Sequence, residues 1–336
     1  MTKVFMKKNI LITGVGGPAS IGAISSLQAS NQQLHIIGVD ANPYAYGFNI
    51  SNEAYVVPYA NDPTYIDEII EIIKAESVDV LIPNTDEEVV SVLKSINRLN
   101  DLVNMFLPSL DAAEIVNNKA KTYEFFSQPS FSEINTPRFS YITKELVIEN
   151  IFDYPMIVKR MVSRGGRGVY KVDSEIDYKY AINKEKNKEG SYQAIVCEYL
   201  PNEEYQVTVL TNYNGEALAI AGYEKVIYRC GNSQVARTIY DFSMFEMAEK
   251  AIKKLGYVGI SCIDFKRDPE GKLFLNEINP RMSSGIDLFT KAGFNFPLAY
   301  LNLILGKEIV VDDKYKVCES DYILTRSYND FVISPK

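Results

Sequence analysis

The chain has 336 residues, of which 46% are hydrophobic and 23% charged, and its formal net charge is -8. This length and composition are typical of a globular protein with about two domains, or three small ones, and a sizeable core. The acidic balance disfavours a nucleic-acid-binding surface, so we expect small molecules as partners and no nucleic acid.

Cysteine usage and hydropathy favour the reducing cytoplasm. The four cysteines are scattered, without a CxxC pair and mostly in apolar runs, which favours buried free thiols. No apolar run reaches the roughly 18 residues of a membrane span, and the N-terminal lysines lead into a glycine-rich turn and not into an export signal. We therefore expect a cytoplasmic protein with no membrane partner. The single histidine, His35, falls in an expected strand, where a structural role is favoured over catalysis.

From Asn9 to Pro108, short apolar runs alternate with helix-like segments. The runs are NILIT, LHIIGVD, DVLIP and MFLP, and the segments between them include PTYIDEIIEIIKAE and DEEVVSVLKSIN. Alternation of strand and helix predicts a parallel sheet with crossover helices.

After Leu110 the pattern changes. A helical stretch, DAAEIVNNKAKTYEFFSQ, precedes irregular chain around Pro129 and Pro137 and then two expected strands joined by a Gly/Arg loop in YPMIVKRMVSRGGRGVYKV. We next expect a helix in SEIDYKYAINKEKNKEG, strands in QAIVCEYL, EEYQVTVLTN and EALAIAGYEKV, and a helix in FSMFEMAEKAIKKLG. A hairpin around Asp264 and a helix in NFPLAYLNLILGK follow. This order predicts a doubly wound domain and then a mixed α+β unit rich in antiparallel strands.

The first expected strand ends in a turn that matches a dinucleotide-binding fingerprint. Gly14, Gly16 and Ala19 satisfy GxGxxA, and Asp40 ends the second expected strand about 20 residues later. In that motif the glycines let the backbone approach a pyrophosphate at a helix N-terminus. The fingerprint supports an NAD(P)-dependent oxidoreductase, although the rest of the sequence has no evident acid/base groups for hydride transfer.

The stretch LFLNEINPR places Glu277, Asn279 and Arg281 at alternate positions of an expected strand, so their side chains share one face. A tight turn in the preceding DPEG would put Asp264 opposite Leu275 and diagonal to Glu277, on that same face. Asp264, Glu277 and Asn279 are oxygen donors, which suit Mg²⁺ or Mn²⁺ bound with substrate phosphates. The sequence therefore predicts a site for one or two ions, with a solvated edge face as the alternative.

A cationic, glycine-rich loop follows the strand that ends near Lys159. In MVSRGGRGV the glycines free backbone N–H groups to close over phosphates, while Lys159, Arg164 and Arg167 supply positive charge. A mobile hairpin tip is the alternative. In CEYLPNEEYQV a short linker joins two expected strands, where Glu204, or Glu203 if the linker is shifted, is placed to accept hydrogen bonds from ribose hydroxyls.

Together these pieces resemble the ATP-grasp superfamily over residues 8 to 306, and ILITGVGGPASIGAISSL looks like single-module relatives of the carbamoyl-phosphate synthase large chain. The resemblance is carried by Lys119 or Lys121, Lys159, the loop Arg164, Gly165, Gly166, Arg167 and Gly168, Glu198, Glu204, Asp264, Glu277, Asn279 and Arg281. It implies an α/β and α+β fold, with a Rossmann-like pre-ATP-grasp domain followed by a two-part ATP-grasp fold. The expected domains are residues 1–110, a linker helix and small lid domain at 111–198, a catalytic domain at 199–310 and a C-terminal tail at 311–336.

The resemblance also implies where the cofactors lie. ATP would lie between two antiparallel sheets, with two Mg²⁺ ions on the predicted metal ligands. Adenine would contact Glu198, Tyr199 and Leu200, the ribose Glu204, and the phosphates Lys121 and Lys159, with Lys119 as the alternative to Lys121. In such enzymes the glycine-rich domain does not hold NAD but forms one wall of the substrate site.

The implied activity is that of an ATP-dependent carboxylate-amine ligase, which makes an acyl phosphate and releases ADP and phosphate. Arg281 would neutralise the developing charge, and Arg237, or with less support Arg229, would contribute to the substrate site. Its partners would be a small carboxylate and an amine or ammonia. A homodimer is the expected assembly, because dimers are the commonest symmetric oligomers. The alternatives are an enzyme that phosphorylates bicarbonate or carbamate and the oxidoreductase above. With one module and no glutaminase segment in this sequence, we do not expect carbamoyl phosphate synthesis from glutamine.

Overall fold

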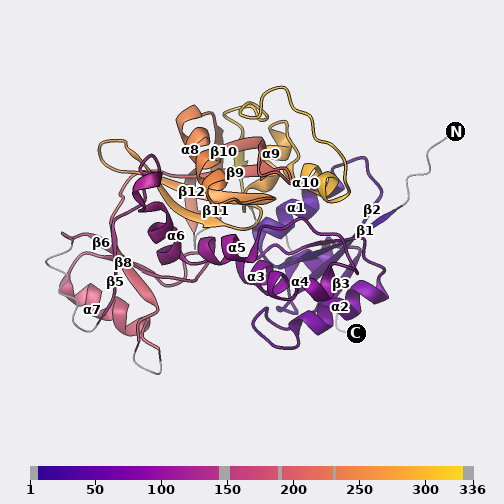
Figure 1. Ribbon diagram of the computed structural model, residues 1–336, viewed down its shortest axis with the longest axis horizontal. Coiled ribbons are helices and arrows are strands. Elements are labelled where there is room, and N and C mark those ends of the chain that lie inside the picture. The colour runs from indigo at the N-terminus through magenta and orange to yellow at the C-terminus, as the bar shows by residue number, and fades with distance from the viewer. Residues whose placement is uncertain (1–6, 144–151, 188–190, 230–231, 328–336) are drawn as a thin grey trace.

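The computed structural model describes residues 7–143, 152–187, 191–229 and 232–327, which form three sheets with their helices (Figure 1). In Figure 1 the N-terminal sheet lies at the lower right, a small antiparallel sheet at the lower left, and a large sheet above both. None of the helices in these ranges is long and apolar enough to cross a bilayer. Cys197 and Cys262 are buried free thiols, as predicted, whereas Cys230 lies outside the described residues.

The N-terminal sheet is parallel, in the order β3-β2-β1-β4. Its strands are β1 (Lys8–Thr13), β2 (Leu34–Asp40), β3 (Glu53–Val56) and β4 (Val80–Ile82), and its helices are α1 (Pro18–Gln28), the 3-10 turn η1 (Tyr46–Asn49), α2 (Tyr65–Ala75), α3 (Asp86–Lys94) and α4 (Ile96–Leu99). The predicted parallel sheet is confirmed. MFLP does not form a strand, and β3 is an exposed edge strand, EAYV, which lacks the apolar run that would have predicted it.

The small sheet is antiparallel, in the order β5-β8-β6-β7. It consists of β5 (Phe139–Tyr141), β6 (Met156–Arg160), β7 (Val169–Val172) and β8 (Ala194–Glu198), with helix α7 (Glu175–Lys184). Tyr178 and Ala181 of α7 pack with Met156 and Val158 of β6, so this sheet has a core of its own.

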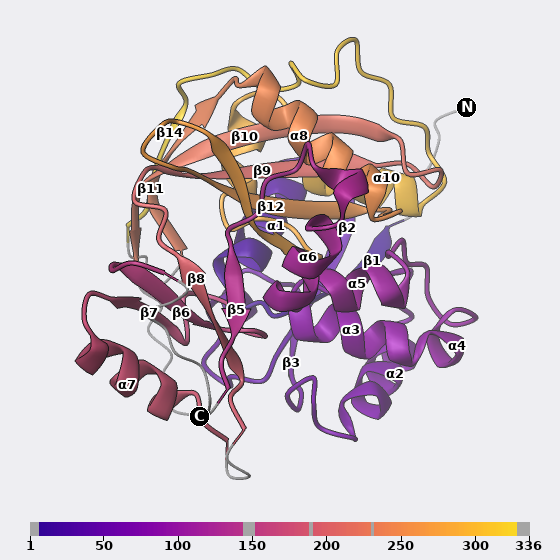
Figure 2. The same cartoon turned by 60° about the vertical axis from the view of Figure 1, so that its left-hand side comes forward.

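The large sheet has the order β13-β12-β9-β10-β11-β14. It lies in the upper part of Figure 2. Its strands are β9 (Glu204–Thr211), β10 (Ala217–Arg229), β11 (Asn232–Ile239), β12 (Ile260–Arg267), β13 (Leu273–Asn279) and β14 (Ile323–Thr325). The accompanying helices are α5 (Leu110–Val116), α6 (Lys119–Phe126), the 3-10 turn η2 (Pro129–Phe131), α8 (Phe242–Lys254), α9 (Ile286–Lys291) and α10 (Phe296–Ile304). One face of this sheet packs on α8, and Val116 and Phe126 of α5 and α6 join the same core.

Strand β1 connects the N-terminal sheet to the rest of the molecule. Because side chains alternate along a strand, Ile10 and Ile12 lie on one face and Leu11 on the other. Ile10 and Ile12 share a core with Ile286 of α9 and with residues of α10, whereas Leu11 packs with α2. One face of the N-terminal sheet therefore shares a core with the C-terminal part of the chain, whereas its other face packs on α2 in a separate cluster.

The expected C-terminal tail is joined to the large sheet, and its strand β14 extends to Thr325. Strand β14 pairs with β11, Ile220 N–H donates to Lys314 O over 2.8 Å, and Glu319 N–H donates to Ala292 O over 2.8 Å. We propose a three-part division in which α5, α6 and residues 311–327 belong with the large sheet, instead of with a lid and a tail.

Candidate functional site

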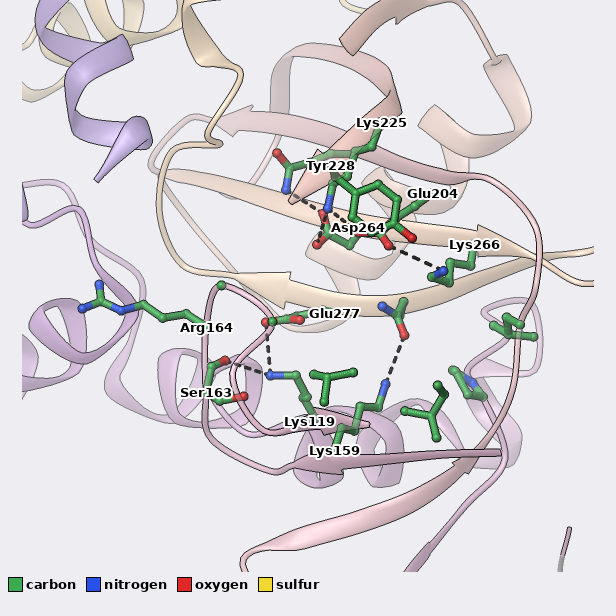
Figure 3. Close-up of a pocket in the computed structure, with 18 of the residues that line it drawn as sticks. Lys119, Lys159, Ser163, Arg164, Glu204, Lys225, Tyr228, Asp264, Lys266 and Glu277 are labelled. Carbon is green, nitrogen blue, oxygen red and sulfur yellow. Dashed lines mark hydrogen bonds and ion pairs between the residues drawn. The ribbon is translucent and has the colours of Figure 1, made fainter. Parts of the chain in front are cut away.

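A cavity of about 540 Å³ separates the small sheet from the large sheet (Figure 3). We call it the inter-sheet cavity. One side is lined by residues of β6 and β7 and the loop between them, and the other by residues of β9, β10, β12 and β13. Most of the side chains singled out in the sequence lie here.

The hairpin of β12 and β13 brings Asp264 and Glu277 together in a register that differs from the predicted one. Asp264 lies opposite Glu277 and not opposite Leu275. The turn extends by one residue to Lys272, and a β-bulge at Asn276 adds another. The two changes shift the pairing by two residues in all, so Asp264 keeps its predicted face. The bulge also turns Asn276, which sequence reasoning missed, toward the cavity.

Lys225 on β10 lies between two carboxylates of the inter-sheet cavity (Figure 3). Its Nζ contacts Glu204 and lies 3.0 Å from Asp264 Oδ2, and its side chain is 2% exposed. Burial opposes ionisation of Glu204, but Lys225 and Lys266 outweigh it and lower the pKa of that carboxyl group. In the sequence, Lys225 stands out as a lysine near the end of the largely apolar run AIAGYEKV. Sequence reasoning did not recognise it as functional.

The lysine that α6 directs into the cavity is Lys119. Its Nζ lies 3.3 Å from Glu277 Oε1, whereas Lys121 is exposed and outside the cavity lining. The expectation for Lys121 is therefore wrong, because two residues along a helix turn a side chain by about 200°. Lys159 of β6 also lines the cavity, with its Nζ 3.1 Å from Asn276 Oδ1.

The glycine-rich loop between β6 and β7 divides its residues between two sites. The inter-sheet cavity is lined by Arg164, Gly165 and Gly166. Arg167 lines only the second cavity described below, and Gly168 lines neither. Gly168 has a φ of +67°, and a Cβ there would lie 2.9 Å from Arg160 Cβ, so glycine is required to close the turn. Arg164 extends away from Glu277 in Figure 3, and its Nε lies 3.3 Å from Glu87 Oε2 of α3.

The linker after β8 borders the same cavity. Its lining residues are Glu198, Tyr199, Leu200, Pro201 and Glu204, whereas Glu203 is exposed and outside the lining. The Glu198 carboxylate accepts hydrogen bonds from Arg138 N–H (2.7 Å) and Arg138 Nε (2.8 Å), which fix the start of the linker. Of the two glutamates left open by the sequence, only Glu204 faces the cavity.

The donor set fits a metal ion that is bound together with phosphate. Asp264, Glu277 and Asn279 all line the inter-sheet cavity and offer hard oxygen ligands. Within the described ranges there is no group of three His, Cys, Asp or Glu residues able to hold a metal. Lys119 contacts the carboxylate of Glu277, and Lys225 contacts that of Asp264. A polyanionic ligand would balance these lysines and complete the coordination with its own oxygens.

Arg281, just after β13, connects the large sheet to the N-terminal domain. Its Nε lies 3.1 Å from Oδ1 of the buried Asp86, and its NH2 donates to Asn279 Oδ1 over 3.1 Å. Although burial would lower the pKa of Arg281, the Asp86 carboxylate outweighs it and raises that pKa, so the guanidinium stays charged. Asp86, at the start of α3, was not recognised from the sequence.

A second cavity of about 650 Å³ lies at the carboxyl ends of β1, β2 and β4, next to the glycine-rich loop. We call it the N-terminal cavity. It shares four lining residues with the inter-sheet cavity: Arg164, Gly165, Arg281 and Ser284. The edge where parallel strands end is the usual ligand site of such sheets, so the two cavities form adjoining compartments with charged side chains at their junction.

The glycine-rich turn after β1 lines the N-terminal cavity, but its geometry does not favour a dinucleotide. Asp40 Oδ2 accepts a hydrogen bond from Gly16 N–H over 2.7 Å, so a carboxylate already occupies a donor that a pyrophosphate would need. Gly14 has a φ of +62°, and a Cβ there would lie 2.4 Å from Thr85 Cγ2. Its role is close packing against the start of α3.

Arg237, which was expected at the substrate site, lines neither cavity. It lies on β11, and its NH2 pairs with Glu224 Oε2 at 2.6 Å. This part of the prediction is wrong, because the register of β11 could not be read from the sequence. The side chain of Arg229 lies outside the described part of the chain.

Two family models match the chain. Residues 191–325 match "ATP-grasp in the biosynthetic pathway with Ter operon", and residues 10–105 match "PylC-like, N-terminal domain". The first match includes β14, which agrees with the placement of residues up to 325 in the large sheet.

Individual relatives are distant but cover most of the chain. The arginine-specific carbamoyl phosphate synthase large chain of Halalkalibacterium halodurans is 23% identical over 90% of this chain, which spans only 30% of that protein. A formate-dependent phosphoribosylglycinamide formyltransferase of Prochlorococcus marinus is 25% identical, and the alignment covers 90% of this chain and 78% of that protein. Among solved structures, the biotin carboxylase domain of the Hydrogenobacter thermophilus 2-oxoglutarate carboxylase, solved with MgADP and bicarbonate, has a TM-score of 0.72 at 17% identity. The superposition covers 94% of this chain and 73% of that chain. This last likeness shows the fold.

Proposed function

Because the chain belongs to the ATP-grasp superfamily of ligases, we propose that it activates a carboxylate with ATP and joins it to an amine or ammonia. The predicted Rossmann-like pre-ATP-grasp domain and two-part ATP-grasp fold are confirmed. The observation that carries the proposal is the junction of two cavities at Arg281 and Arg164, which lets a nucleotide and a second substrate meet.

In the proposed complex, ATP occupies the inter-sheet cavity. Its adenine lies at the linker Glu198–Leu200, its ribose at Glu204, and its phosphates near Lys119, Lys159 and the glycine-rich loop. Asp264, Glu277 and Asn279 would hold two Mg²⁺ or Mn²⁺ ions, which neutralise phosphate charge when they are bound. Lys225 keeps Glu204 and Asp264 in place through its two ion pairs.

The proposed reaction has two steps. A carboxylate oxygen attacks the γ-phosphorus as the bond to the ADP oxygen breaks, which gives an acyl phosphate and ADP. The amine nitrogen then attacks the acyl carbon, loses a proton, and phosphate leaves. Arg281 stabilises the charge that develops at the acyl phosphate, because Asp86 holds its guanidinium at the junction of the cavities.

An alternative is phosphorylation of bicarbonate or carbamate. It is favoured by the similarity to carbamoyl phosphate synthase over 90% of this chain. A cavity of about 650 Å³ is in the range for organic ligands of about 300 to 1,000 Å³ and exceeds what bicarbonate requires. The carboxylate-amine ligase is therefore our first proposal.

Hydroxylamine separates these possibilities, because a strong nucleophile captures an acyl phosphate in place of the amine. We expect a hydroxamate, ADP and phosphate when the protein is incubated with Mg-ATP, hydroxylamine and a panel of carboxylic acids. Product masses and nucleotide chromatography give the readout. AMP and pyrophosphate would indicate adenylation instead, and ADP formed only with bicarbonate would favour the alternative.

A further inference from the structure

The N-terminal cavity separates charges of opposite sign according to the element that carries them. Its acidic lining residues, Asp40, Glu87 and Glu88, all belong to the N-terminal domain, whose described residues contribute no lysine or arginine to the lining. The arginines, Arg164, Arg167 and Arg281, come from the small-sheet loop and the segment after β13. One wall is therefore anionic, and the wall next to the inter-sheet cavity is cationic.

Two of the acidic residues have no cationic side-chain partner among the described residues. Arg164 pairs with Glu87, and Arg281 pairs with Asp86 behind the lining. Glu88 and Asp40, by contrast, have no salt bridge to any described residue. Glu88 is 7% exposed, and its Oε2 accepts a hydrogen bond from Thr13 Oγ1 over 2.5 Å. Within the described part of the chain, Asp40 accepts hydrogen bonds only from the backbone N–H groups of Gly16 and Asn42.

A buried carboxylate without a counter-ion is unfavourable in the folded protein. Consistent with this, burial raises the pKa of Glu88 to about 7, against the opposing effects of Thr13, Thr85 and Arg164 and with a small contribution from Asp40. A ligand ammonium group would supply the missing partner. A phosphate or a second carboxylate would instead be repelled by this wall.

We propose that the substrate activated in the N-terminal cavity is a zwitterion, a carboxylic acid that also carries an ammonium group, as amino acids do. This inference rests on the proposed ligase function and names its substrate class. The ammonium group binds Glu88 and Asp40, and the carboxylate faces Arg281 at the boundary with the nucleotide. The charge pattern thereby orients the acid for phosphoryl transfer and excludes bicarbonate, sugar acids and phosphorylated acids.

The test uses matched pairs of substrates. ADP release and hydroxamate formation are measured with Mg-ATP and hydroxylamine for the proteinogenic L-amino acids and for the desamino acid that corresponds to each, with bicarbonate and gluconate alongside. We expect at least one amino acid to stimulate ADP release about tenfold or more over its desamino partner, because the desamino acid cannot form the charged hydrogen bond of the ammonium group.

The variant Glu88→Gln keeps the shape and the acceptor for Thr13 but loses the charge. We expect it to lower kcat/KM for that amino acid by about tenfold or more while Mg-ATP affinity, which depends on the other cavity, is unchanged. Glu71→Gln, on the exposed side of α2, is the matched control and should resemble the parent.

The inference would be overturned, with the ligase proposal left standing, if a desamino acid formed hydroxamate as fast as its amino acid. Hydroxamate from a sugar acid alone would have the same meaning. Full activity of Glu88→Gln would also overturn the inference. ADP release without hydroxamate from any acid would contradict the ligase proposal and the inference together.

Discussion

Glu277 is the residue on which the proposed metal site depends most directly. It lies opposite Asp264 across the hairpin and next to Lys119. We predict that Glu277→Gln abolishes ATP cleavage while the protein stays folded, because loss of one metal-binding charge removes several kcal/mol of transition-state stabilisation, on the order of a hundredfold or more in rate. Circular dichroism checks the fold and phosphate release measures turnover.

Glu270→Gln is the control for this variant, since Glu270 lies in the exposed turn of the same hairpin and lines neither cavity. It should turn over like the parent. If Glu277→Gln retains turnover within about tenfold of the parent, the metal role proposed for Glu277 is refuted.

Individual site residues could be predicted where strand periodicity alone fixes the face. Glu277 and Asn279 lie two residues apart on one strand, so their common face followed from the sequence. Lys119 and Lys121 could not be distinguished, because that choice depends on the rotation of α6 against the sheets. Asn276 reaches the cavity only through a bulge, which no local pattern announces. These residues depend on tertiary contacts and not on local propensity.

At the scale of elements, the glycine-rich loop is the segment whose behaviour should respond most to nucleotide. Its residue Arg164 faces both cavities, and Lys119 Nζ donates to Ser163 O over 2.9 Å. We predict that a Mg-ATP analogue slows tryptic cleavage at Arg164 and Arg167, because phosphate-covering loops become ordered over their ligand. Mass spectrometry of the fragments gives the rate at each site.

Cleavage at Arg98, in the short helix α4 away from both cavities, provides the internal control and should proceed at the same rate with and without nucleotide. Equal rates at Arg164 in both conditions would contradict a covering role for the loop.

Elements were predicted best where chain composition changes sharply. The strands β6 and β7 follow from the Gly/Arg turn between them. Helix α8 lies within the segment predicted to be helical, and in the structure the Asp241 side chain accepts a hydrogen bond from Met244 N–H and caps it. The short strands β3 and β14 were missed, because an exposed edge strand needs no apolar run. Their positions are set by the neighbouring strands β2 and β11.

At the scale of the whole molecule, the N-terminal domain is tied to the large sheet by packing and by charge. Ile12 and Ile286 share one core, and the Asp86–Arg281 pair crosses the same boundary. The sequence indicated separate domains in the correct order, but it could not show this shared core, because the contacts join residues more than half the chain apart. The shared core explains how the acidic N-terminal wall is held in place against Arg281.

The stability of the whole fold should show a pH dependence that originates at Glu88. For this carboxyl group the folded-state pKa is raised, to about 7, above the ordinary value of 4.5. The unfolded chain therefore loses its proton first as the pH rises, and the folded state is penalised between the two values and fully above the higher one. The largest penalty that such a shift allows is about 3 kcal/mol.

We predict that Glu88→Gln, which cannot ionise, raises the free energy of unfolding relative to the parent at about pH 8 and changes it little at about pH 5. Urea unfolding at both pH values measures the difference, and subtraction of the parent curve removes the pH dependence of all other groups. The exposed Glu71→Gln should show no such change between the two pH values. A Glu88→Gln protein that is destabilised equally at both pH values would show that the pKa of Glu88 is not raised in the folded protein. If Glu88→Gln has a higher free energy of unfolding at high pH and also loses amino-acid activation, the Glu88 carboxylate destabilises the free protein and serves to bind a cationic ligand.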